Sequence, residues 1–189
     1  MGALVVECVA VMKSPWKCTA KLLVMVGLLG LAACNPETTT AMSNEEKLAR
    51  IEEMTAGFRP QFADVPEVDA ATLREDLARG AVVLVDVRSA KERATSMIPG
   101  AITTDEFQQR KNELAGSSVV TYCTIGYRSS TYAQRLLKDG WEVRNFHGSV
   151  LAWTHAGGEL VDPEGKPTRR VHVFAERWSL TADGYEPVW

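Results

Sequence analysis

Residues 117–140, SSVVTYCTIGYRSSTYAQRLLKDG, carry the pattern that decides the fold. The apolar run at 117–122 predicts a short strand, and residues 129–139 predict a helix that ends at Gly140. Cys123 follows directly after the predicted strand. Because ligands of open α/β sheets bind beyond the carboxyl ends of the strands, Cys123 is the first candidate for a reactive group.

The surrounding sequence continues this alternation of short strands and helices. Asp69 is a predicted N-cap and Gly80 a predicted C-terminal stop for a helix at 70–79. The valine-rich run AVVLVDV at 81–87 predicts a strand that is buried on both faces. The pattern therefore predicts an α/β fold with a central, mainly parallel sheet flanked by helices. Further strands are expected at 142–146 and 171–174, and further helices at 45–56, 89–93, 104–114 and 150–156.

The loop that begins at Cys123 has features that favour a reactive thiolate. Its backbone amides are expected to converge in front of the following helix, where the helix dipole also attracts an anion. Gly126 permits the tight curvature, and Arg128 can hold an anionic substrate in bidentate fashion. The competing interpretation is that Cys123 is a structural cysteine packed in the core. A reactive role for Cys123 requires a thiol that a substrate can reach. The amides concerned are those of Thr124, Ile125, Gly126 and Tyr127.

Three stretches of the chain resemble the rhodanese-like family. CTIGYRS at 123–129 is similar to the family's active-site loop, C-x-x-G-x-R followed by Ser or Thr. VDVRSAKERATSMIPGA at 85–101 is similar to its D-V-R … E … H-I-P-G-A stretch, with Met97 in place of the usual histidine. Residues 146–158, which include Trp153, resemble the family's L-x-G-G … W … G ending. The match is specific at two of these stretches, the cysteine loop and the motif at 85–101, which both point to the same family.

The resemblance implies sulfurtransferase chemistry. Cys123 would attack the outer sulfur of thiosulfate or a related small anionic donor, hold it as a persulfide and pass it to a thiol or protein acceptor. Residues 124–128 would hold the anion. No cofactor is expected, and the spacing of the four cysteines and three histidines predicts no metal site. Supporting, structural roles are assigned to Asp86, Arg88 and Ser129, and a packing role to Trp141, Trp153, Trp178 and Trp189.

Two other functions compete with this interpretation. Phosphatases and arsenate reductases of the C-x5-R type cradle a tetrahedral oxyanion in a loop with five residues between Cys and Arg. Here four residues separate Cys123 from Arg128, which predicts a loop too small for phosphate. The second alternative is a non-catalytic rhodanese-like module that binds a partner or senses redox state at the cell envelope.

The start of the chain has the order of residues found in a secretory signal. Residues 12–34, MKSPWKCTAKLLVMVGLLGLAAC, run from lysines through an apolar segment to small residues and a cysteine. LAAC at 31–34 resembles the bacterial lipobox, which implies cleavage before Cys34 and attachment of lipid to it. We expect a lipid-anchored domain that faces the periplasm, with translation starting at Met1 or Met12.

The predicted organisation follows from these segments. The formal net charge of −3 gives no basic footprint for nucleic acid, so no nucleic-acid partner is expected. The expected parts are a lipoprotein signal peptide at 1–34, a flexible tether at 35–44, a helical segment at 45–67, a rhodanese-like domain at 68–161 and a C-terminal extension at 162–189 that packs on the domain.

Overall fold

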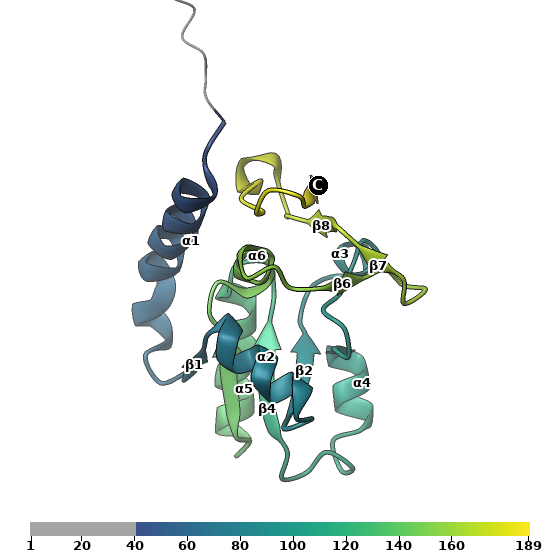
Figure 1. Cartoon of the computed structure of the whole chain (residues 1–189). Helices are drawn as coiled ribbons and strands as arrows, with labels where there is room; N and C mark the ends of the chain where they lie inside the picture. Colours follow the sequence, from purple (N-terminus) through teal and green to yellow (C-terminus); the bar gives the residue numbers. More distant parts are fainter. Residues whose placement is uncertain (1–40) are drawn as a thin grey trace, which may run out of the picture. The chain divides into compact units, whose positions relative to one another are not determined.

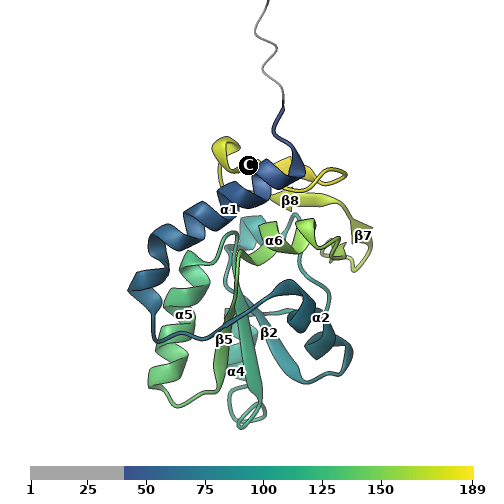
Figure 2. The same ribbon diagram turned by 60° about the vertical axis from the view of Figure 1, so that its left-hand side comes forward.

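The computed structural model describes residues 41–189, whose central feature is a parallel five-stranded sheet (Figures 1 and 2). Strands β2 and β4 pair from Val82 opposite Ser118 to Asp86 opposite Tyr122, so their carboxyl ends meet at one edge. The predicted α/β fold class is confirmed. In spatial order the strands are β1 (Glu67–Val68), β5 (Val143–Phe146), β4 (Ser118–Tyr122), β2 (Val82–Asp86) and β3 (Ile102–Thr103).

Helices cover both faces of the sheet, because neighbouring strand residues point to opposite sides. Leu84 of β2 belongs to one apolar cluster, and the next residue, Val85, belongs to a second. The first cluster contains side chains of α1 (Asn44–Phe58), α2 (Ala70–Ala78) and α6 (Ser149–His155). The second contains side chains of α4 (Thr104–Gln109) and α5 (Tyr127–Lys138). The shorter helices are η1 (Arg59–Phe62), α3 (Ala90–Arg93) and η2 (Glu176–Trp178).

Local backbone geometry corrects several predicted boundaries. Asp69 caps α2 as predicted, by accepting a hydrogen bond from the Thr72 amide. The helix predicted at 129–139 begins two residues earlier, because Gly126 takes a left-handed conformation (φ 118°) that turns the chain directly into α5. The helix predicted at 104–114 ends at Gln109 and is followed by turns.

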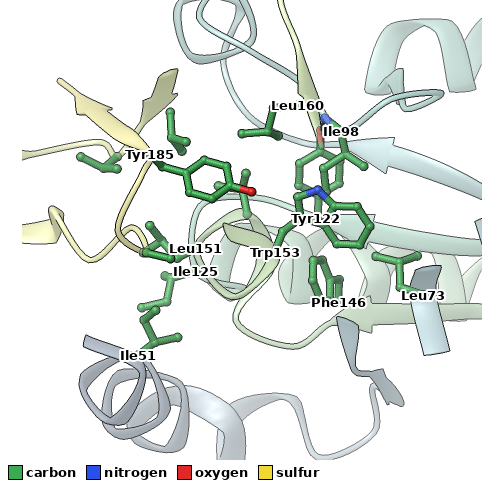
Figure 3. Packing of buried hydrophobic residues seen from close by; sticks show 14 of the residues in the cluster. Ile51, Leu73, Ile98, Tyr122, Ile125, Phe146, Leu151, Trp153, Leu160 and Tyr185 are labelled. Atoms are coloured by element: carbon green, nitrogen blue, oxygen red, sulfur yellow. Dashed lines mark hydrogen bonds between the residues drawn. The ribbon is translucent and has the colours of Figure 1, made fainter. Parts of the chain in front are cut away.

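The first apolar cluster reaches up into the cysteine loop (Figure 3). Ile125, which the sequence assigns to substrate binding, is only 3% exposed and lies in the cluster with Ile51 and Leu151. Tyr122 and Phe146 extend the cluster along β4 and β5. The loop is therefore anchored in the core by one of its own side chains.

The C-terminal residues form two small sheets that pack against the same cluster. β6 (Leu160–Val161) pairs antiparallel with β7 (Pro167–Thr168), and β8 (Arg170–His172) pairs parallel with β9 (Glu186–Val188). The strand predicted at 171–174 is thus shorter and ends at His172. Five side chains of this segment join the core: Val171, Val173, Leu180, Ala182 and Tyr185.

Some predictions concern residues that the structure does not describe. The signal segment at 1–34, Cys34 and most of the tether at 35–44 lie outside the described residues. Among residues 41–189, no helix combines the length and the apolar character needed to cross a membrane.

We predict that the C-terminal segment unfolds together with the sheet. Leu180 is 4% exposed, so Leu180→Ala should lower the free energy of unfolding by about 2–5 kcal/mol through lost burial and the cavity left behind. Trp189→Ala, at a position that is 54% exposed, should change it by less than about 0.5 kcal/mol. Urea denaturation followed by circular dichroism measures both. Two separate transitions, with only the first shifted by Leu180→Ala, would contradict the prediction.

Candidate active site

Cys123 lies at the carboxyl end of β4, where the loop to α5 begins. Its sulfur accepts a hydrogen bond from the Gly126 amide over 3.1 Å. Its own amide donates to the Ser149 hydroxyl over 3.1 Å, and its carbonyl accepts from the Val150 amide over 3.2 Å. The Leu151 amide likewise donates to the Thr124 carbonyl over 3.2 Å. The start of α6 therefore holds the backbone of the cysteine loop.

The far side of the loop is fixed by Ser129 and Gly126. The Ser129 hydroxyl donates to the Gly126 carbonyl over 3.1 Å, and the Thr121 hydroxyl donates to the Ser129 carbonyl over 3.1 Å. A Cβ atom at Gly126 would lie 3.4 Å from the Asn145 amide nitrogen and 3.5 Å from the Phe58 ring, in addition to requiring a left-handed backbone. These contacts fit the supporting role assigned to Ser129 from the sequence.

Arg128 is bound by a carboxylate of the protein itself. Its Nη1 and Nη2 atoms lie 2.8 and 2.6 Å from the two oxygens of Glu92, whose side chain is 3% exposed. The Thr124 hydroxyl accepts from Arg128 over 3.0 Å and donates to Glu92 over 3.0 Å. The sequence predicts that Arg128 offers its guanidinium to a bound anion. That role stays a prediction. In the structure, the two terminal nitrogens of Arg128 that would form a bidentate contact with an anion bind Glu92.

Electrostatics hold both members of this pair in their charged forms. Burial opposes ionisation of Glu92, but hydrogen bonds from Arg128 and from the Ser89 amide and hydroxyl outweigh it and lower the Glu92 pKa to about 2. Hydrogen bonding to Glu92 raises the pKa of Arg128, and the neighbouring Cys123 adds to the effect. The pair therefore contributes one positive and one negative charge beside the thiol.

A second buried ion pair braces the ends of β2 and β4. Asp86 and Arg88 have fully buried side chains joined by hydrogen bonds of 2.7–3.1 Å. The Tyr122 hydroxyl donates to Asp86 over 2.6 Å and accepts from the Ile98 amide over 3.1 Å. Burial, together with the charge of Asp86, raises the pKa of Tyr122, which keeps it a donor. Asp86 and Arg88 thus brace the residue that precedes Cys123, while their supporting role in the reaction stays a prediction.

The thiol lines a small cavity but is itself almost fully buried. Cys123 is 1% exposed, so the requirement of a freely reachable thiol is not met in this conformation. The cavity has a volume of about 210 Å³, and the loop from Cys123 to Arg128 forms one side of it. Phe174 and Trp178, from the C-terminal segment, also line it, and we call these two residues the cover.

This cover corrects the role predicted for one tryptophan. Trp178 packs against the first apolar cluster, as expected, but it also lines the cavity beside Cys123. Two larger hollows, of about 670 and 470 Å³, contain no residue of the cysteine loop. Within residues 41–189, no group of three or more His, Cys, Asp or Glu side chains could hold a metal ion.

Sequence reasoning assigned no role to Glu92, Ser149 or Phe174. Glu92 has a visible local signal, since S-x-x-E at 89–92 is a capping box, and both of its hydrogen bonds are present. Ser149, which follows Gly148, has a left-handed backbone (φ 51°) that no sequence pattern predicts. Phe174 reaches the site only through the fold of the C-terminal segment.

Comparison with known proteins shows what the central part of the chain is similar to. The Rhodanese-like domain model matches residues 69–156. A sulfurtransferase from Allochromatium vinosum is 36% identical over 106 residues, which cover 53% of this chain and 99% of that protein. The tRNA uridine(34) hydroxylase from Burkholderia ambifaria is 27% identical over 159 residues, which cover 68% of this chain and 56% of that protein. The chain thus spans only about half the length of this hydroxylase.

Two solved structures also match part of the chain. A thiosulfate sulfurtransferase from Pseudomonas aeruginosa is 29% identical, with a TM-score of 0.48, and the match covers 66% of this chain and 24% of that chain. A rhodanese-related protein from Thermoplasma volcanium is 23% identical, with a TM-score of 0.45, and the match covers 51% of this chain and 97% of that chain.

We predict that Glu92 makes stability depend on acid pH. Because its pKa is about 2 in the folded chain and 4.5 in the absence of these contacts, its contribution is complete above pH 4.5 and is lost as pH falls toward 2. The urea midpoint of the wild type should therefore drop more between pH 5 and pH 3 than that of Glu92→Gln. Parallel midpoints for the two proteins over this range would refute the assignment.

Proposed function

Because the chain belongs to the rhodanese-like sulfurtransferase family, we propose that it transfers sulfane sulfur through a persulfide on Cys123. One observation carries the proposal: the Cys123 sulfur, at the end of β4, accepts a hydrogen bond from the Gly126 amide, the residue directly before the start of α5 at Tyr127. Backbone amides and a helix N-terminus stabilise negative charge, which both the thiolate and the persulfide carry.

The reaction needs only a donor and an acceptor. The Cys123 thiolate attacks the outer sulfur of thiosulfate or a related donor and forms a sulfur–sulfur bond. The donor's own bond to that sulfur breaks, and the leaving group, sulfite in the case of thiosulfate, departs with the electron pair. A nucleophile such as cyanide, a thiol or a protein cysteine then takes the terminal sulfur and restores the thiolate.

The proposed parts played by neighbouring residues follow from their contacts. The amides of residues 124–127 would hold the anion, with Ile125 anchoring the loop in the core. Arg128 would act through its pair with Glu92, by keeping the Thr124 side of the loop in place. Ser149 would fix the Cys123 amide.

One observation favours a second candidate function. A thiol that is 1% exposed under two aromatic side chains is also what a non-catalytic module would carry, in which the loop serves partner binding or redox sensing. Hydroxylation of tRNA is not carried over, because the chain spans only about half the length of the matched hydroxylases. The four-residue spacing from Cys123 to Arg128 likewise disfavours phosphate chemistry.

We predict that thiosulfate adds one sulfur atom to the protein. Intact mass spectrometry of the thiosulfate-treated wild type should show this addition, and cyanide should remove it with release of thiocyanate. Cys123→Ser should show neither, while Ser117→Ala, a control just before β4 at the end of the strand away from the loop, should behave as the wild type. If the wild type gains no sulfur from any sulfane donor, the non-catalytic alternative takes its place.

We also propose that Cys34 anchors the domain to the cell envelope, with the domain in the periplasm. The support is the order of residues at 12–34. In a bacterial host, the wild type should remain with the membrane fraction, whereas Cys34→Ala should lose its lipid and be released. Cys18→Ala, a change inside the expected signal, serves as the control and should stay with the membrane. Equal membrane retention of both variants would rule out the lipid anchor.

A further inference from the structure

We propose that Phe174 and Trp178 determine which donor enters the site, and that they select a monoanionic donor with an apolar body over inorganic thiosulfate. Both residues lie beyond residues 69–156, the part matched by the family model. The inference rests on the proposed sulfur transfer at Cys123. An organic thiosulfonate, in which an alkyl or aryl group replaces one oxygen of thiosulfate, is the donor class that fits.

The cavity wall is largely apolar. Phe174 and Trp178 lie with their ring centroids 5.3 Å apart and line the same cavity as Cys123. Ile125 and Tyr127 add further apolar surface from the loop. Aromatic and aliphatic walls gain free energy from contact with an apolar group and gain none from the oxygens of a sulfonate.

The charges around the cavity disfavour a dianionic donor. Among its lining residues, all of which lie in the described part of the chain, Arg128 is the one cation. Both of its terminal nitrogens bind the Glu92 carboxylate, so the pair adds no net charge. The reacting Cys123 thiolate is itself negative. A dianion is therefore repelled by the thiolate more strongly than a monoanion, and only a donor with an apolar body can also use the apolar wall.

The backbone of Phe174 is strained. This residue has φ 70°, in the left-handed region that bulky side chains rarely adopt. Its amide donates to Nδ1 of His172 over 3.1 Å, which helps hold the unfavourable conformation. Its ring lies against the Arg128 guanidinium, 5.8 Å from ring centroid to guanidinium carbon, although the side chain is more than half exposed. Strain of this kind persists where a side chain must be held at a binding site.

The size of the cavity limits the donor. Its volume of about 210 Å³ is below the roughly 300–1,000 Å³ of ordinary small-molecule sites, which leaves room for a single ring or a short alkyl group. The transfer balances without any oxidant or reductant. Cys123 forms a bond to the outer sulfur of R–SO₂–S⁻, the bond between the two donor sulfurs breaks, and R–SO₂⁻ leaves with the electron pair.

The test compares benzenethiosulfonate with thiosulfate, using cyanide as acceptor and the full chain. The wild type should show the higher kcat/KM with benzenethiosulfonate. Phe174→Gly and Trp178→Ala should each lower the ratio of kcat/KM for benzenethiosulfonate to kcat/KM for thiosulfate by about tenfold or more, because kcat/KM falls for benzenethiosulfonate. Trp189→Ala, an exposed tryptophan of the same segment, is the matched control and should leave the ratio unchanged.

Phe174→Gly separates selection of the donor from a structural role. Glycine accepts the left-handed backbone, so this variant should keep the thermal midpoint of the wild type while losing selectivity. A purely structural role would lower the midpoint and slow both donors equally, and that result overturns the proposal. A wild type that prefers thiosulfate, or a ratio that neither variant changes, overturns it as well.

A binding measurement distinguishes failure of this proposal from failure of sulfur transfer itself. Calorimetry on Cys123→Ser, with benzenesulfinate as the probe, reports on the cavity without any reaction. Weaker binding by about tenfold in Cys123→Ser/Phe174→Gly supports the selection even if no donor is turned over. Equal binding by the two proteins, or none by either, overturns it even if the wild type forms the persulfide.

Discussion

The hydrogen bonds between the cysteine loop and the start of α6 are the constraint on which the site depends. The first amides of a helix have no partner within the helix itself, and here those of Val150 and Leu151 bind the carbonyls of Cys123 and Thr124. With these carbonyls drawn toward α6, the loop can curve so that the Gly126 amide turns back to the sulfur. The thiol position is thus set by a helix more than twenty residues away in sequence.

The two ion pairs around the loop solve the same problem of buried charge. Removing a carboxylate or a guanidinium from water is costly unless it is paired and hydrogen-bonded. Asp86 and Arg88 pair beneath the end of β4, and Glu92 and Arg128 pair beside the cavity. The Glu92–Arg128 pair joins segments that the backbone alone would leave apart, whereas Asp86 and Arg88 lie two residues apart and reach β4 through the Tyr122 hydroxyl. A consequence for chemistry is that the positive charge of Arg128 beside the cavity is balanced by Glu92, so amides and apolar contact contribute more to the binding of a donor.

The parts of this structure that follow local rules could be predicted, and those that depend on distant contacts could not. The valine-rich runs of β2 and β4, the Asp69 cap and the cysteine loop each carry a signal within a few residues. Strands β1 and β3 have only two residues each and exist through pairing with longer neighbours. The early start of α5 follows from the left-handed backbone at Gly126, and the Glu92–Arg128 pair joins residues 36 positions apart. No local pattern contains that information.

The cover over Cys123 gives the site a balance between protection and access. A persulfide exposed to water and to other thiols would lose its sulfur before reaching the intended acceptor, so burial favours retention. Burial also means that a donor has to pass the side chains that line the cavity, and the Phe174 side is the more exposed part of the cover. That side is the part of the cover least supported by the fold: Phe174 is more than half exposed and lies on a strained backbone, whereas Trp178 packs against the core. Entry past Phe174 therefore disturbs the fewest stabilising contacts, which makes the same side chain both the weakest part of the cover and the first surface that a donor meets.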